Sequence, residues 1–324
     1  MARPGRVVIG LAALAVVAGT AVAVKLGFGP LPDPQGCSAT VAGRTVDLDP
    51  EQSENAALIA AIAVQRGMPA RAASIALATA YQESKILNIE HGDRDSIGLF
   101  QQRPSQGWGT RKQILDPYYS INAFYDALAK IDGYESMRIT EAAQRVQRSG
   151  FPEAYQDHAD DARTLASALT GQSQGGRFSC VVRHATDAES DRLDDAGLTA
   201  RAAGVRQDLK AAFGDLALGG FAPGGVTEGH MKGSAHYEGR ALDVFVRPIG
   251  KENRKRGWAM AYYLVAQAER LGIDHVIFDA RIWSAGGRSE DGWRDYSPGD
   301  TGGKSASTVA VLEHRDHVHV DVLD

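Results

Sequence analysis

Residues 314–322 read His-Arg-Asp-His-Val-His-Val-Asp-Val, and this stretch decides how the second half of the chain is interpreted. Apolar and polar residues alternate with the period of two that a β-strand requires. The three valines would share one face of the strand, and the other face would carry His317, His319 and Asp321. The stretch therefore predicts a strand that buries its valines and presents two imidazoles and a carboxylate together.

A second segment, residues 233–246, reads Gly-Ser-Ala-His-Tyr-Glu-Gly-Arg-Ala-Leu-Asp-Val-Phe-Val. It places His236 in a turn and Asp243 inside a β-type run whose flanking leucine and valines would face the core. One aspartate and histidines from two strands can supply three nitrogen or oxygen ligands, the number that a catalytic zinc binds while keeping a fourth position for water. Either segment alone is typical of surface histidines on an edge strand, but the two together predict a zinc site.

The spacing His-x6-Asp followed by His-x-His, with the wording Ser-x-His-x-x-Gly-Arg-Ala-x-Asp-Val, resembles the D-alanyl-D-alanine carboxypeptidase and Hedgehog-type zinc peptidase group. The resemblance covers about 120 residues. It implies that His236, Asp243 and His319 bind zinc. It also implies that Asp316, three residues before the last ligand, is the base.

Strand geometry conflicts with that base. An odd separation puts Asp316 and His319 on opposite faces of a regular strand, so Asp316 can act only if the chain bends or the strand starts between them. His317, on the metal-facing side, is the competing base. Three other polar residues could bind a substrate carboxylate or steady the ligands, or could be ordinary loop residues: His230, Arg240 and His314.

The first half of the chain contains a different candidate. Residues 72–81 carry no charge, which predicts a helix buried on nearly every side. Glu83 follows directly, where such a helix would meet water. A carboxyl group emerging into a cleft would be partly desolvated, which raises its pKa toward that of a general acid. Taken alone, a glutamate at a helix end is usually a solvated charge.

The order Glu83-Ser84, then Asn88, then Ser-Ile-Gly-Leu-Phe-Gln over residues 96–101 resembles the lysozyme-like lytic transglycosylases over about 100 residues. The resemblance implies that Glu83 protonates a glycosidic oxygen. It also implies glycan contacts from Ser96, Gln101 and Tyr119.

The chain departs from that family at residues 93–95, where Asp-Arg-Asp replaces small residues. Asp93 or Asp95 could supply the second carboxylate that a conventional glycosidase needs, whereas a lytic transglycosylase uses a single acid. Alternatively, both aspartates only form the turn.

The N-terminus predicts export. Arg3 and Arg6 precede an apolar stretch over residues 7–24, which is the order of a signal peptide or of an uncleaved signal anchor. Cys37 and Cys180 are the only cysteines, and in an oxidising compartment we expect them to pair, with two free thiols as the alternative. Closing so long a loop would stabilise the fold by roughly 5 kcal/mol in the chain-entropy model.

The length of 324 residues exceeds what one core usually organises and favours two domains. We expect a mostly α, lysozyme-like domain followed by an α+β, zinc-peptidase-like domain with a small, largely antiparallel sheet. The predicted boundaries are a signal segment over 1–28, a Pro-rich linker over 29–50, the first domain over 51–172, a linker over 173–197 and the second domain over 198–324.

Within these domains the clearer predicted helices are 55–66, 70–85, 120–130, 140–148, 198–213 and 252–271, and residues 276–278 are a predicted buried central strand. Trp283, Trp293 and Tyr296 either wall the cleft or pack in the core. We expect His91, His158, His184 and His275 to be structural, because the sequence gives them no convergent partner.

The net charge is -5, and the sequence has no basic tail and no RNA-reading motif. We therefore do not expect a nucleic-acid partner. An exported sugar-cleaving fold joined to an exported zinc amide hydrolase predicts a peptidoglycan hydrolase. We expect a zinc-dependent monomer that meets the membrane only through its N-terminal segment. The alternatives are a wall-binding or regulatory protein without chemistry, and a protein in which only the zinc domain is active.

Overall fold

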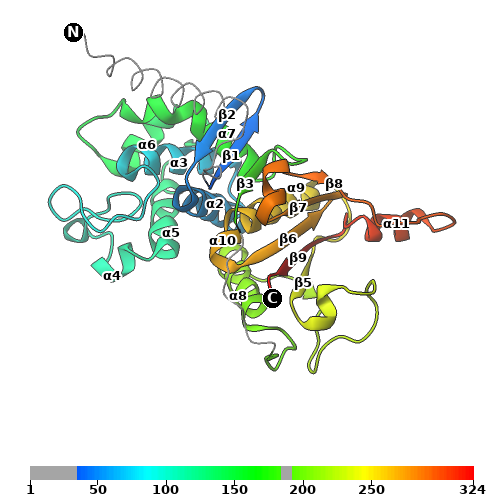
Figure 1. The fold of residues 1–324 in the computed structure, drawn as a ribbon. Helices are drawn as coiled ribbons and strands as arrows, with labels where there is room; N and C mark the ends of the chain where they lie inside the picture. The colour runs from blue at the N-terminus through cyan, green and yellow to red at the C-terminus, as the bar shows by residue number, and fades with distance from the viewer. Residues whose placement is uncertain (1–34, 184–191) are drawn as a thin grey trace, which may run out of the picture. The chain divides into compact units, whose positions relative to one another are not determined.

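The computed structural model describes residues 35–183 and 192–324 (Figure 1). The predicted signal segment and His184 lie outside these residues. The described chain has helices and two antiparallel sheets, which agrees with the α+β class expected for the second half; the sheet in the first half was not predicted. Its first half contains β1 (Gly36–Val41), β2 (Arg44–Leu48), α2 (Pro50–Gln65), α3 (Ala70–Ser84), α4 (Arg111–Ile114), α5 (Pro117–Leu128), α6 (Ile139–Gln147), α7 (Ala159–Leu169) and β3 (Phe178–Val181). Its second half contains α8 (Ala200–Phe213), β4 (Leu218–Gly219), β5 (Ala241–Phe245), α9 (Lys251–Ala266), α10 (Ala268–Leu271), β6 (Ile273–Phe278), β7 (Arg281–Ser284), β8 (Arg294–Asp295), α11 (Ala306–Leu312) and β9 (His317–Val322).

The smaller sheet has the order β2-β1-β3 and lies in segments that we expected to be linkers. Its strands hold apolar residues at alternate positions, and Ala39, Val46 and Phe178 are buried. Cys37 lies directly opposite Cys180 in the β1–β3 register, and the two form the disulfide predicted from the sequence. The strand pairing and the disulfide therefore hold the segments before and after the helical region together in one sheet.

Two helices form the centre of the first half. Asp49 caps α2 by accepting from the backbone of Gln52, whose side chain accepts in return from the backbone of Asp49. This reciprocal cap, with Pro50 at the first helical position, explains why α2 begins five residues before the predicted start at Asn55. The predicted buried helix is α3, and it ends at Lys85, which adopts a left-handed conformation.

The larger sheet has the order β4-β5-β9-β6-β7-β8, and its strand pairs are antiparallel. The predicted central strand is β6, which lies between β9 and β7 and is buried over residues 276–278. The helix predicted over 252–271 is divided into α9 and α10 at Gln267, whose side-chain amide donates to the carbonyl of Glu54 in α2.

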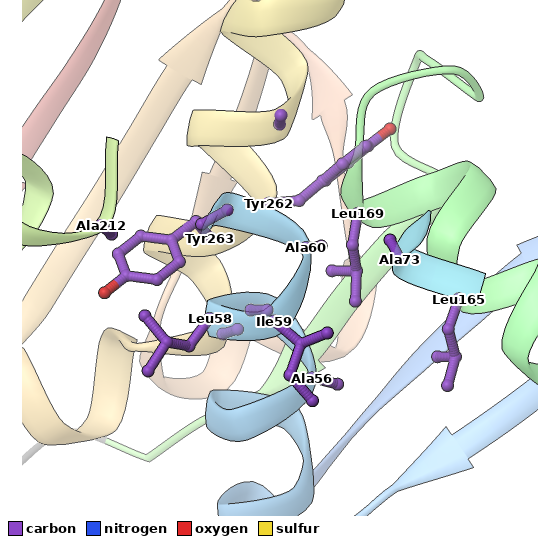
Figure 2. Close-up of a cluster of buried hydrophobic side chains, with 14 of the residues drawn as sticks. Ala56, Leu58, Ile59, Ala60, Ala73, Leu165, Leu169, Ala212, Tyr262 and Tyr263 are labelled. Carbon is purple, nitrogen blue, oxygen red and sulfur yellow. The ribbon is translucent and has the colours of Figure 1, made fainter. Parts of the chain in front are cut away.

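Residues 35–324 form one compact unit, so a layout of two separate domains is not established. Helix α2 packs against α3 and α7 of the first half and against α8 and α9 of the second half. Figure 2 shows the resulting cluster, in which Leu58 and Ile59 of α2 lie near Tyr263 of α9 and Leu169 of α7. All four side chains are buried.

Within the described part of the chain, no helix is both long and apolar enough to span a membrane.

Candidate metal centre

Three side chains from separate parts of the second half meet at one point. Asp243 of β5 and His319 of β9 are directly opposite in the antiparallel register, so their side chains leave the sheet on the same face. His236 approaches from a short 3-10 helix, Ala235–Glu238, just before β5. All three are at most 7% exposed.

The three donor atoms form a nearly equilateral triangle. His236 Nε2 lies 3.1 Å from His319 Nδ1 and 3.4 Å from Asp243 Oδ1, and His319 Nδ1 lies 3.1 Å from Asp243 Oδ1. Nitrogen and oxygen ligands that bind zinc tetrahedrally at about 2.0 to 2.1 Å are about 3.3 Å apart. The spacing of the donors thus fits a single zinc ion.

Hydrogen bonds away from the triangle fix which nitrogen of each imidazole faces it. His236 Nδ1 lies 2.7 Å from the carbonyl oxygen of Gly220, which can only accept, so the proton of a neutral His236 is on Nδ1. His319 Nε2 lies 3.3 Å from Asp321 Oδ2. Both free nitrogen lone pairs therefore point at each other and at the Asp243 carboxylate.

Three converging lone pairs, one of them on a buried anion, repel one another unless a cation lies between them. Burial opposes ionisation of Asp243, yet His236 and His319, which donate to its carboxylate when they are protonated, lower its pKa. Burial likewise opposes protonation of His319, but Asp243 and Asp321 raise its pKa to about 9. The site thus attracts either a proton or a metal ion. His230, His236 and Asp243 also have donor atoms close enough together to hold a metal.

The two candidate bases are bound to each other. His317 Nδ1 lies 2.7 Å from Asp316 Oδ1, and His317 Nε2 faces the centre, 3.8 Å from Asp243 Oδ1. The second oxygen of Asp316 accepts from Arg247 at 2.7 Å. Strand β9 begins at His317, so Asp316 lies before the strand. The alternation of side chains between the two faces of β9 therefore does not fix the direction of the Asp316 side chain.

The centre opens into a pocket of about 390 Å³. His230 stacks on His236 with 3.8 Å between ring centroids, and His314 lies against His317 at 4.6 Å. Burial and the neighbouring His319 and His317 lower the pKa of His314 to about 3, so this ring is neutral at pH 7. Apolar and aromatic side chains complete the walls: Met231, Phe245, Ile277, Tyr296, Val311 and Leu312.

Some predicted residues lie elsewhere. Arg240 pairs with Glu238 and Asp324 and donates to the carbonyl of Val322, and it does not line the pocket. Trp283 and Trp293 are packing residues, because their indole nitrogens donate to backbone carbonyls of β3. Of the three aromatic residues considered for the cleft, the pocket lining includes only Tyr296.

Two residues of the centre were not among the predicted site residues. His275, expected to have no convergent partner, lies with Nδ1 2.9 Å from Asp321 Oδ1. Gly220 has a φ of +79°, and a Cβ there would lie 2.3 Å from His236 Cε1. A Gly-Gly pair such as residues 219–220 is typical of a turn, but nothing in the sequence connects it to a histidine 16 residues later.

The first half places Glu83 at the C-terminal end of α3. Its Oε1 accepts a hydrogen bond of 2.7 Å from the hydroxyl of Tyr155, a buried residue that the sequence analysis did not single out. Ser84, next in the chain, donates to the carbonyl of Leu99 at 2.8 Å and so joins the end of α3 to a hairpin over residues 97–102. The hairpin itself is closed by a bridge between Ile97 and Gln102.

The other three residues predicted to contact glycan make most of their own contacts within the hairpin and the loops beside it. Gln101 donates weakly to the carbonyls of His91 and Gly98, both at 3.3 Å, and Ser96 is buried and bonded to the carbonyl of Asp93. Tyr119 packs against Gly109, where a Cβ would lie 2.7 Å from its hydroxyl. Within residues 35–183 and 192–324, none of these three side chains is hydrogen-bonded to Glu83.

The two turn aspartates have different surroundings. Asp95 accepts from Arg103 at 2.6 Å and from the backbone of Ser105 at 2.8 Å, and these contacts lower its pKa. The side chain of Asp93 is 92% exposed beside Arg94. Asp95 thus has a structural role in the turn.

A comparison with protein-family models matches residues 194–309 to VldE, C-terminal domain. The matched segment contains His236 and Asp243 and ends before Asp316. A search of curated proteins found no match to the chain.

Proposed function

We propose that this chain is an exported peptidoglycan hydrolase whose second half hydrolyses peptide bonds with a zinc ion held by His236, Asp243 and His319. The observation that supports this most strongly is the triangle of donor atoms with edges of 3.1, 3.1 and 3.4 Å. A zinc ion bound there would lower the pKa of a water molecule and polarise a scissile carbonyl.

His317 is the base in this proposal. Its Nε2 faces the centre, while Asp316 holds its Nδ1 at 2.7 Å. Asp316 would fix the tautomer and stabilise the imidazolium that forms when Nε2 takes a proton, as the carboxylate of a catalytic triad does. Because both oxygens of Asp316 are already bound, to His317 and Arg247, the carboxylate acts through His317.

The first half would cleave the glycan strand with Glu83 as the acid. This part of the proposal rests on the resemblance to lytic transglycosylases and on the position of Glu83 at the end of a buried helix. Asp95 is committed to Arg103 and Ser105, which favours the single-acid lytic reaction over hydrolysis with two carboxylates.

The proposal is tested by digesting purified cell walls with matched variants. Asp243→Asn should abolish the release of new amino groups and leave sugar-end release intact. Glu83→Gln should do the reverse, and the exposed Glu90→Gln should change neither product. The proposal is wrong if neither Asp243→Asn nor Glu83→Gln alters digestion. Wall binding without either product would instead identify a wall-binding protein.

A further inference from the structure

An irregularity in the sheet brings an additional histidine to the outer side of the metal centre. Strand β6 pairs with β9 through Ile273 opposite Val322 and His275 opposite Asp321, so two steps on β6 match one step on β9. Such a bulge inserts an extra residue, here Asp274, and changes the directions of the side chains beside it. As a result Asp274 and His275 both reach the same carboxylate region.

The contacts form a chain that leads inward to the metal centre. His275 Nδ1 lies 3.2 Å from Asp274 Oδ2 and 2.9 Å from Asp321 Oδ1. The other oxygen of Asp321 lies 3.3 Å from His319 Nε2. Side-chain exposure decreases along the same chain, from 35% for His275 to 15% for Asp321 and 9% for His319.

The direction of each hydrogen bond follows from the chemistry. A carboxylate can only accept, so His319 donates from Nε2 and leaves Nδ1 as the ligand atom. His275 donates from Nδ1 to Oδ1 of Asp321, the oxygen that does not contact His319, and so fixes the orientation of that carboxylate. Carboxylates placed in this way behind a metal-binding imidazole orient the ring and raise its basicity.

We propose that Asp321 and His275 are positioning residues, Asp321 holding His319 as a zinc ligand and His275 acting through Asp321. This inference rests on the proposed zinc site. It assigns a role to a histidine that the sequence left without one.

The same side chains could instead bind a second metal, because donor atoms of Asp274, His275 and Asp321 lie within 4.8 Å of one another. Two observations favour positioning. Asp321 already shares its second oxygen with His319, and His275 presents one nitrogen to two carboxylates at 2.9 and 3.2 Å, the arrangement of a shared N–H.

The test measures zinc affinity of the full chain by competition with a chromophoric chelator. Asp321→Asn should weaken zinc binding about 10- to 100-fold. His275→Gln should weaken it less, and the double variant should match Asp321→Asn alone, because His275 acts through Asp321. Asp295→Asn, an exposed aspartate of β8, is the control and should leave affinity unchanged.

Two further readouts separate positioning from a general effect on folding. The visible spectrum of the cobalt-substituted protein should shift in Asp321→Asn and return toward that of the unmodified chain in Asp321→Glu. Nitrogen NMR of the zinc-loaded, unmodified chain should show the proton of His319 on Nε2, a result that needs no variant to fold.

Additive effects of the two substitutions, unchanged affinity in Asp321→Asn, or a proton on Nδ1 of His319 would overturn the positioning role alone. Two zinc ions per chain, one of them lost in His275→Gln, would replace it with a second metal site. An unmodified chain that binds no zinc would refute the proposed function and this inference with it.

Discussion

Gly220 provides a sharp test of the metal centre, because its missing side chain makes room for a ligand. A Cβ at this position would lie 2.3 Å from His236 Cε1 and 2.6 Å from Nδ1, whereas ordinary contacts begin at 3.4 Å. In Gly220→Ala the ring must therefore move by about 1.1 Å, the difference between 3.4 and 2.3 Å. Such a movement would also break the 2.7 Å bond between His236 Nδ1 and the Gly220 carbonyl.

Gly220→Ala is expected to lower both the stability of the fold and the affinity for zinc. Alanine at a φ of +79° costs roughly 1 kcal/mol of stability, whatever surrounds it. The displacement of His236 is a separate effect, because losing a contact that orients a metal-binding histidine lowers metal affinity about 10- to 100-fold. We expect the fall in zinc affinity in Gly220→Ala to be about 100-fold, at the upper end of this range, because the ligand itself is displaced.

Gly224→Ala is the matched control, since Gly224 has a φ of +81° but no atom within 4 Å of a Cβ. Chelator competition should show normal zinc affinity in this variant. Thermal unfolding in chelator should show the backbone cost of about 1 kcal/mol in both variants, and a further loss in Gly220→Ala from the displaced ring and its broken hydrogen bond. Equal zinc affinity in the two alanine variants would refute the geometry described for His236.

Three other predictions follow from the contacts above. His317→Gln should lower the rate of peptide cleavage about 100- to 10,000-fold with little change in zinc affinity, and Asp316→Asn should lower it less; a larger loss in Asp316→Asn would make Asp316 the base. Replacing Cys37 and Cys180 by alanine should lower the free energy of unfolding by about 5 kcal/mol in denaturant titrations, because the disulfide closes a separation of 143 residues; a loss below about 1 kcal/mol would contradict this estimate. Burial lowers the pKa of His275, but Asp274 and Asp321 raise it to about 10. In metal-free protein its contribution to stability is therefore complete below about pH 6.5 and lost as the pH rises through 10, and His275→Gln should remove that part of the pH dependence.

The parts of the structure that the sequence predicted well are those with a strong local period. The alternation over residues 317–322 coincides with β9, and the polar face of this strand carries His319 of the candidate metal centre. The uncharged run over 72–81 likewise corresponds to the interior of α3. In both cases the pattern itself reports burial, so no long-range information is needed.

The parts that were missed depend on partners distant in sequence. Strand β3 has four residues and joins its sheet by pairing with β1, where Cys180 lies opposite a cysteine 143 residues earlier. His275 meets Asp321 because of a bulge, which no sequence period records. The role of Gly220 depends on where a ring 16 residues later is placed. Such features follow from tertiary packing rather than from local sequence.

The packing between the two halves also could not be anticipated. A residue count near 300 favours two cores. The structure instead packs α2 against α9, and Tyr263 is buried near Leu58 (Figure 2). An alanine-rich helix that is buried on all sides needs neighbours on all sides, and α9 supplies one of them.

The most direct test of the account is elemental analysis of the purified chain after dialysis against metal-free buffer. We predict one zinc ion per chain in the unmodified protein, loss of that ion in His319→Ala, and retention in His91→Ala, whose side chain is exposed and does not line the pocket of the centre. A natively folded chain without zinc, or a zinc content that His319→Ala leaves unchanged, would contradict the assignment of His236, Asp243 and His319 as a metal centre.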